Sequence, residues 1–195
     1  IVIMVQRSQL FQMSESKTGS VRILPRRYFD RPTVEVARSL VGKYLVRENG
    51  QGEISGKIIE VEAYVGPRDK ACHASKGRTK RTDVLFGPPG MSYVYLIYGM
   101  YHCLNVVTER EEFPAAVLIR AIEVEGTLID GPGRLCRALN IDRNLNRCDL
   151  TVGRNLWLEN RAVRVKQTDV GAYPRIGVDY AGVWAKKLWR FRLRK

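Results

Sequence analysis

The sequence is poor in the residues that usually build metal sites. It contains only two histidines, His73 and His102, and four cysteines, none of which stand in a C-x-x-C spacing. A structural zinc site needs four such ligands at short, regular spacing, so we expect no metal site. Four thiols without a disulfide-dense pattern favour a reducing, intracellular compartment.

Long apolar runs are also missing. No stretch approaches the roughly 20 apolar residues of a membrane-spanning helix, so we expect no membrane association. The opening IVIMVQRSQLFQM has too short an apolar run for a secretion signal and no clear cleavage site. The polar stretch SESKTGS follows it, and we expect residues 1–22 to be a flexible lead-in to one folded domain over residues 23–195.

Acidic residues are few compared with basic ones. The sequence has 33 lysines and arginines against 20 aspartates and glutamates, which gives a net charge of +13. The basic residues fall in blocks such as KGRTKR, and such blocks predict a polyanionic partner, most often nucleic acid. A basic surface that serves only solubility remains the alternative.

Two segments have the pattern of amphipathic helices. The stretch FDRPTVEVARSLVG predicts a short helix that Asp30 caps and Gly42 ends. The stretch GPGRLCRALNI predicts a second helix, with Leu135, Ala138 and Leu139 on one face.

The remaining signals are those of strands. Two extended runs flank the Asn49-Gly50 pair, which is a strong hairpin signal, and SYVYLIYG and AAVLIRAIE are further strand candidates. The tail LWRFRLRK alternates apolar and basic residues, as an edge strand with charge on its solvent face would. These elements predict an α+β fold in a single domain, with a mixed, largely antiparallel sheet and flanking helices.

Chemically interesting side chains follow the alternation of these strands. In an extended IIEVEAYV segment, Ile58, Glu60, Glu62 and Tyr64 share one face, and the apolar residues between them must form the core. Both glutamates would then lie on a solvent-facing side. Taken singly, such glutamates are usually only solvated, so the alternation alone does not predict catalysis.

The same alternation of side chains also groups residues on the next two predicted strands. It places Tyr93, Tyr95 and Ile97 together on one strand, and Leu118 and Arg120 together on another. Strand tyrosines usually pack against their cross-strand neighbours. It is the combination of carboxylates, aromatic residues, an arginine and a basic loop that favours a site.

Several motifs together resemble one known family. The blocks IIEVEAYVGPRDKACHASKGRT, GPPGMSYVYLIYGMYHCLNVV, AAVLIRAIE and GPGRLCRALNI resemble, in this order, the alkyladenine (3-methyladenine) DNA glycosylases. The resemblance runs from about Leu24 to the end of the chain. It implies a base-excision repair enzyme that flips alkylated or deaminated purines out of duplex DNA and hydrolyses the N-glycosidic bond.

The resemblance also implies roles for individual residues. Glu62 corresponds to the carboxylate that activates a water, Arg120 to an arginine near the sugar, and Ile176 to the residue whose carbonyl helps to hold the water. Tyr64 corresponds to the tyrosine wedged into the minor groove. The expected base pocket comprises His73, Tyr95 and Asn105.

The physical chemistry of base excision fits these roles. A carboxylate beside the sugar would stabilise the developing oxocarbenium charge and take a proton from water. No lysine resembles a Schiff-base nucleophile, so we expect simple hydrolysis without strand cleavage. We also expect no cofactor. We expect phosphate contacts from Arg78, Lys80 and Arg81, and from the tail arginines Arg190, Arg192 and Arg194.

The expected partner is therefore double-stranded DNA containing alkylated purines, bound by a monomer at the nucleus or nucleoid. Two alternatives stay open. The first is a catalytically weak module that binds damaged DNA, and the second is a hydrolase of small nucleosides.

Overall fold

The computed structural model describes residues 22–162 and 164–194 as one α+β domain. In these residues ten strands form one sheet, and every strand pair in it is antiparallel. The strands are β1 Arg22–Ile23, β2 Tyr44–Glu48, β3 Glu53–Val65, β4 Ser92–Ile97, β5 Tyr101–Val107, β6 Ala115–Val124, β7 Thr127–Asp130, β8 Leu156–Asn160, β9 Val170–Tyr173 and β10 Arg190–Leu193. The helices are α1 Arg26–Phe29, α2 Thr33–Leu40 and α3 Pro132–Ala138, and the 3-10 turns are η1 His73–Lys76, η2 Asp83–Phe86, η3 Arg143–Leu145, η4 Gln167–Asp169 and η5 Asp179–Trp184.

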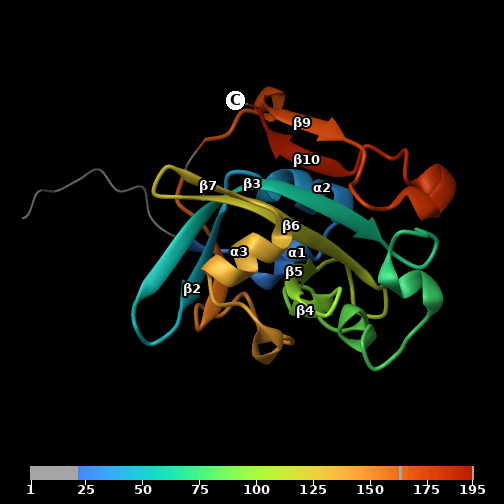
Figure 1. Ribbon diagram of the computed structural model, residues 1–195, viewed down its shortest axis with the longest axis horizontal. Helices are drawn as coiled ribbons and strands as arrows, with labels where there is room; N and C mark the ends of the chain where they lie inside the picture. The colour runs from blue at the N-terminus through green and yellow to red at the C-terminus, as the bar shows by residue number, and fades with distance from the viewer. Residues whose placement is uncertain (1–21, 163, 195) are drawn as a thin grey trace, which may run out of the picture.

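The long strand β3 is the centre of the sheet. The strand order is β1-β8-β2-β3-β6-β5-β4, and β10 pairs with β3 on one side and with β9 on the other. The predicted hairpin at Asn49-Gly50 is confirmed, because β2 pairs with the first part of β3 across that turn. In Figure 1 the green segment after β3 and the red turn η5 lie at the same end of the molecule, and this end carries the site described below.

The two predicted helices form, with local corrections. Helix α2 begins at Thr33, and Asp30 does not cap it. Glu109 takes that role from a distant loop, since its Oε1 accepts hydrogen bonds from the Thr33 amide at 3.1 Å and the Thr33 hydroxyl at 2.6 Å. In α3, Leu135 is buried as expected, but Ala138 is exposed.

The C-terminal strand β10 is not an edge strand, contrary to the sequence-based prediction. It lies between β3 and β9, with Arg190 opposite Glu62 and Arg192 opposite Glu60. In the sequence, an edge strand and a strand beside buried carboxylates show the same alternation of apolar and basic residues, so the pattern cannot distinguish the two positions. Arg190 and Arg192 on this face are therefore only partly exposed, because both pair with the β3 carboxylate Glu60.

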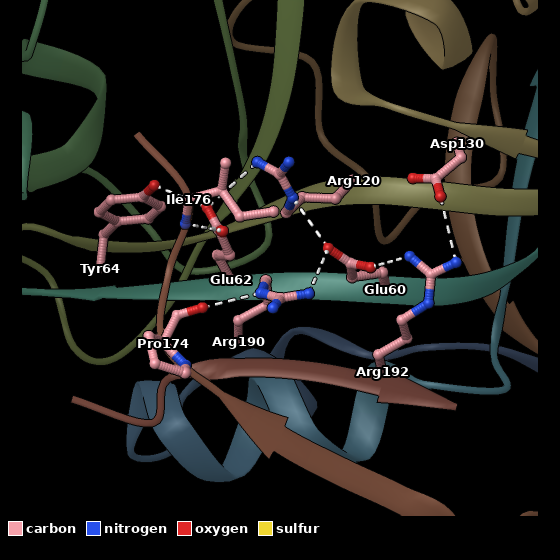
Figure 2. A network of polar contacts seen from close by, with 9 residues as sticks. All are labelled: Glu60, Glu62, Tyr64, Arg120, Asp130, Pro174, Ile176, Arg190 and Arg192. Atoms are coloured by element: carbon pink, nitrogen blue, oxygen red, sulfur yellow. Dashed lines mark hydrogen bonds and ion pairs between the residues drawn. The ribbon is translucent and has the colours of Figure 1, made fainter. Parts of the chain in front are cut away.

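The face alternation of β3 also differs from the prediction at one point. The register between β3 and β6 shifts on both sides of Glu60, and such an irregularity moves side chains to the other face. Ile58 consequently joins Val61 in the main hydrophobic core, whereas Ile59 lies outside that cluster. On the other face, Glu60 and Glu62 lie together as predicted (Figure 2).

The main core joins the sheet to its helices. Its buried side chains come from α2, from α3 and from the core face of the central strands. The predicted lead-in at residues 1–21 lies outside the described residues, and Arg22, which was assigned to it, belongs to β1. Within the described part of the chain, no helix is both long enough and apolar enough to cross a membrane.

Candidate active site

A cavity of about 280 Å³ opens where β3, β4, β5 and β6 meet the loop after β9. Its wall is mostly aromatic and apolar, with a few polar groups, as in most small-molecule pockets. The lining residues include Tyr64, His73, Tyr93, Tyr95, Ile97, Tyr98, Asn105, Leu118, Arg120, Ile176 and Tyr180. The predicted face groupings on β4 and β6 are thus confirmed, because each group lines this one cavity.

Three rings form one side of the cavity. His73 and Tyr95 meet edge to face, with ring centroids 4.7 Å apart, and Tyr93 and Tyr95 are 5.1 Å apart. Asn105 stands beside them on β5 and donates its side-chain amide to the Tyr93 carbonyl at 3.1 Å. Flat aromatic surfaces held in this way are suited to stacking a planar base.

His73 is held as a neutral imidazole. Burial, aided by the positive charges of Arg81 and Lys76, lowers the pKa of His73 to about 4. Its Nδ1 lies 3.0 Å from the Tyr93 hydroxyl. A neutral ring that keeps one N–H can offer a hydrogen bond to the base without adding a positive charge to the cavity.

Glu62 is surrounded by hydrogen-bond donors that belong to three of the cavity-lining residues, Tyr64, Arg120 and Ile176 (Figure 2). Its Oε1 accepts the backbone amide of Ile176 at 2.8 Å. Its Oε2 accepts the Tyr64 hydroxyl at 2.8 Å and faces Arg120 Nη1 at 3.4 Å. The structure therefore brings together all three residues predicted for catalysis, from β3, β6 and the loop after β9.

The expectation of a solvent-facing Glu62 is wrong, because the residue is 0% exposed. The segment that carries Ile176, the Tyr64 ring and β10 all cover it. Burial raises the pKa of Glu62 above the ordinary carboxyl value, and the positive charge of Arg120 opposes this shift. A buried carboxylate of this kind is a stronger base than a solvated one.

Tyr64 and Tyr98 occupy contrasting positions. The Tyr64 ring packs inside the cavity, with the Arg175 guanidinium 4.8 Å from its centroid and its hydroxyl on Glu62. Tyr98 lies in the turn between β4 and β5, lines the cavity mouth and is 83% exposed. Tyr98 also has a left-handed backbone with φ of 52°, which is uncommon for a tyrosine and often marks a functional turn.

A buried ion pair holds the end of β3 to the loop after β9. Arg175 donates to both Asp69 carboxylate oxygens, at 2.5 and 2.9 Å, and both side chains are 0% exposed. Arg175 also donates to the backbone carbonyls of Ala63 and Trp184, at 2.9 and 3.1 Å. This pair fixes the residue directly before Ile176, whose amide binds Glu62.

The predicted phosphate-binding residues lie on the surface near the cavity, with different surroundings. Arg78 is already engaged by Asp83 at 2.7 Å and by Glu112 at 3.1 Å. Arg81 lies 4.9 Å from the centroid of the cavity residue Tyr95, and Lys80 is exposed. Lys80 and Arg81 are therefore better placed than Arg78 to take a new anionic partner.

The tail arginines Arg190 and Arg192 are occupied inside the protein. Both form ion pairs with Glu60, and Arg192 also pairs with Asp130 at 3.1 Å. A role in phosphate binding would require them to leave these partners. The sequence left the role of Glu60 open between a share in the acid–base chemistry and a structural ion pair, and in the structure Glu60 is only 1% exposed and lies at the centre of this network.

Sequence reasoning missed Tyr98 and the Asp69–Arg175 pair, and it did not identify the three arginines that pair with Glu60. The only signal for Tyr98 was its position before Gly99 at the end of a strand, which is where a turn is expected. Asp69 and Arg175 are more than a hundred residues apart, and no local pattern predicts that they meet.

Comparisons with known proteins point in one direction. Residues 27–195 match the model of a family described as methylpurine-DNA glycosylase. A protein of Methanocella arvoryzae is 51% identical, over 87% of this chain and 91% of its own length. Proteins of Legionella pneumophila (50% identical, 89% and 96% covered) and Myxococcus xanthus (51% identical, 88% and 90% covered) are similar too, and all three bear the name "Putative 3-methyladenine DNA glycosylase".

Proposed function

This chain belongs to the methylpurine-DNA glycosylase family and is a base-excision DNA glycosylase, and from that premise we propose how its own residues act. A damaged purine leaves the duplex and enters the aromatic cavity. Glu62 then activates the water that hydrolyses the N-glycosidic bond. The observation that carries the proposal is the position of Glu62, a buried carboxylate bound to Arg120 and to the Ile176 amide at the wall of that cavity.

The chemical step follows from this geometry. As the bond between the sugar and the base breaks, its electrons leave with the base and positive charge develops at the sugar. The Glu62 carboxylate stabilises that charge and takes a proton from the water. The water oxygen then bonds to the sugar carbon. None of the described cavity-lining residues is a lysine, which supports hydrolysis without strand cleavage.

Water must first reach Glu62. Its carboxylate oxygens are engaged by Ile176, Arg120 and Tyr64, and the Tyr64 hydroxyl belongs to a side chain that lines the cavity. We infer that the Tyr64 hydroxyl releases the Glu62 carboxylate when a base is bound, because a base stacked on the Tyr64 ring changes the surroundings of that ring. The Ile176 carbonyl, predicted to hold the water, would then act beside the amide that already holds the carboxylate.

We assign the duplex wedge to Tyr98 and not to Tyr64. A wedge must project from the protein far enough to fill the space that the flipped nucleotide vacates. Tyr98 is exposed at the cavity mouth, whereas Tyr64 is packed against Arg175 and bound to Glu62. Tyr64, together with His73 and Tyr95, is instead placed to stack on the base.

The preferred lesions follow from the cavity wall. Alkylated purines such as 3-methyladenine carry a positive charge, and each aromatic face attracts such a cation by about 0.5–2 kcal/mol. The neutral state of His73 avoids a repulsive charge beside the base. We therefore propose alkylated purines in double-stranded DNA as the substrate, bound by a single copy of the chain.

An excision assay on a lesion panel tests the proposal. Duplexes that carry 3-methyladenine, 7-methylguanine, hypoxanthine or ethenoadenine should develop alkali-labile sites, and the matching free nucleosides should remain intact. Glu62→Gln should lower single-turnover excision by at least about a hundredfold, because it removes the general base. Its duplex affinity should stay close to that of the unmodified protein.

The same assay addresses the alternatives. Lesion binding without excision by the unmodified protein would indicate the catalytically weak binding module. Hydrolysis of free nucleosides would indicate the nucleoside hydrolase. Excision by Glu62→Gln at the normal rate would remove Glu62 from the mechanism.

A further inference from the structure

We propose that Glu60 is a positioning residue, which holds Arg120 and the Pro174–Ile176 segment in place against Glu62. The inference rests on the proposed role of Glu62 as the general base. It assigns to the reaction a second buried carboxylate, which lies two residues before Glu62 on β3 and so further from the cavity residue Tyr64.

Glu60 is the shared acceptor of three arginines (Figure 2). Its Oε1 accepts Arg120 Nε at 3.0 Å and Arg190 Nη1 at 3.4 Å, and its Oε2 accepts Arg192 Nη1. Buried carboxylates persist only when they are paired in this way. Three guanidinium groups from two other strands therefore depend on one carboxylate for their geometry.

The contact with Arg120 determines where that residue points. Arg120 directs Nε to Glu60 and Nη1 to Glu62, so a single planar guanidinium bridges both carboxylates. Because the guanidinium is rigid and flat, holding Nε fixes the direction of Nη1. Without Glu60, Arg120 would be free to turn toward Glu62 or toward the cavity that it lines.

The contact with Arg190 reaches Glu62 from the other side. Arg190 also donates its Nε to the Pro174 carbonyl at 2.8 Å. Ile176, two residues further on, gives its amide to Glu62 at 2.8 Å. Glu60 therefore supports both groups that hold the Glu62 carboxylate, one side chain and one backbone segment.

The network is also balanced in charge. Three carboxylates, Glu60, Glu62 and Asp130, face three guanidinium groups, Arg120, Arg190 and Arg192, so three negative charges cancel three positive ones. Loss of the Glu60 charge would leave one positive charge in excess beside Glu62. An excess positive charge favours the ionised form of Glu62 and makes it a weaker base.

The other titratable and charged groups around Glu62 keep their chemical identity in such a substitution. They are Tyr64 on β3, Cys103 on β5, Arg120 on β6, Arg190 on β10, and Arg175 with its partner Asp69 in the loops beside the cavity. A shift in the titration of Glu62 on replacing Glu60 can therefore be attributed to the lost charge and to the movement of Arg120.

The test is the pH dependence of single-turnover excision by Glu60→Gln. The acid limb of this profile reports the ionisation of the general base. We expect the limb to move to lower pH by about one unit. The plateau rate should fall by about ten- to a hundredfold, because a small misplacement of a catalytic group has effects of this size. A role in folding alone would lower the melting temperature and leave the acid limb where it is.

Asp130→Asn is the matched control. It removes the same single charge from the network, but the Asp130 carboxylate pairs with Arg192 and forms no ion pair with Arg120. We expect its acid limb to match that of the unmodified protein. A double-mutant cycle adds a second check: Glu60→Gln should change the plateau rate less when Arg120 is already glutamine, because only the connection through Arg190 then remains.

An acid limb that stays in place in a folded Glu60→Gln protein overturns the inference. So does an equal shift in Asp130→Asn. If Glu60→Gln does not fold, Glu60→Asp is tested in its place. For Glu60→Asp the inference requires a lower plateau rate with an acid limb that stays in place, and an unchanged plateau rate contradicts the inference. Absence of excision by the unmodified protein on every lesion would instead refute the proposed function.

Discussion

Replacing Asp69 by asparagine should destabilise the protein strongly. Asparagine has nearly the same shape, so the change removes one negative charge and leaves the Arg175 guanidinium buried without its partner. Both side chains are 0% exposed, and the pair joins residues more than a hundred positions apart in the sequence. Because neither side chain is exposed, bulk solvent cannot take the place of the lost carboxylate.

The expected size follows from the burial of the pair. Removal of one partner from a buried, hydrogen-bonded ion pair typically costs about 3–5 kcal/mol. For a domain of this size, each kcal/mol lowers the melting temperature by about 2–4 °C, so the loss should be about 6–20 °C. The amides of Val65 and Ala71 donate to different Asp69 oxygens, each at 3.1 Å, so the single asparagine oxygen can keep only one of these two hydrogen bonds.

Thermal unfolding followed by circular dichroism measures the effect. The control is Glu123→Gln, because Glu123 pairs with Lys57 at 2.9 Å on the sheet surface. Exposed pairs contribute at most about 1 kcal/mol, so this control should lower the melting temperature by less than about 4 °C. The reasoning is refuted if Asp69→Asn loses no more stability than Glu123→Gln.

Three further predictions concern the proposed reaction. Tyr98→Ala should abolish the fluorescence change of a reporter base next to the lesion, whereas Tyr64→Phe should retain it, and the reverse result would return the wedge role to Tyr64. The imidazole resonances of His73 should not titrate between about pH 5 and 8, because its lowered pKa of about 4 keeps the ring neutral there, and an NMR transition near the ordinary value would contradict this. Lys80→Ala should reduce the slope of log affinity against log salt concentration by about 0.9. Arg78→Ala should change this slope less, because two carboxylates already engage Arg78, and equal slopes for the two variants would contradict the distinction.

The sequence alone was sufficient for much of the architecture. Local signals such as the Asn49-Gly50 turn and the alternation of β4 and β6 depend on neighbouring residues, so they can be recognised without a structure. The order of the motifs was equally informative about the family, because the family is recognised by several sequence motifs that follow one another in a fixed order. The gathering of Glu62, Arg120 and Ile176 was expected from that resemblance, and the structure places them in contact.

Other features depended on contacts between distant segments. The alternation of β3 predicted Glu62 on a solvent-facing side, but β10 and the Ile176 segment bury it, and no local pattern shows what covers a strand. The basic residues of β10 indicated an edge strand until the structure placed Glu60 opposite Arg192. Likewise, the sequence indicated several tyrosines near the site but missed Tyr98, and only the fold distinguishes the packed Tyr64 from the projecting Tyr98.

Local chemistry and turn geometry are properties of a few adjacent residues, and the sequence determined these. Burial, ion pairing and the direction in which a side chain can move are properties of the whole packed chain, and the tertiary structure alone decided them. For this protein, the sequence shows that a carboxylate is present, and only the tertiary structure shows that Arg120, Tyr64 and the Ile176 amide hold it away from water.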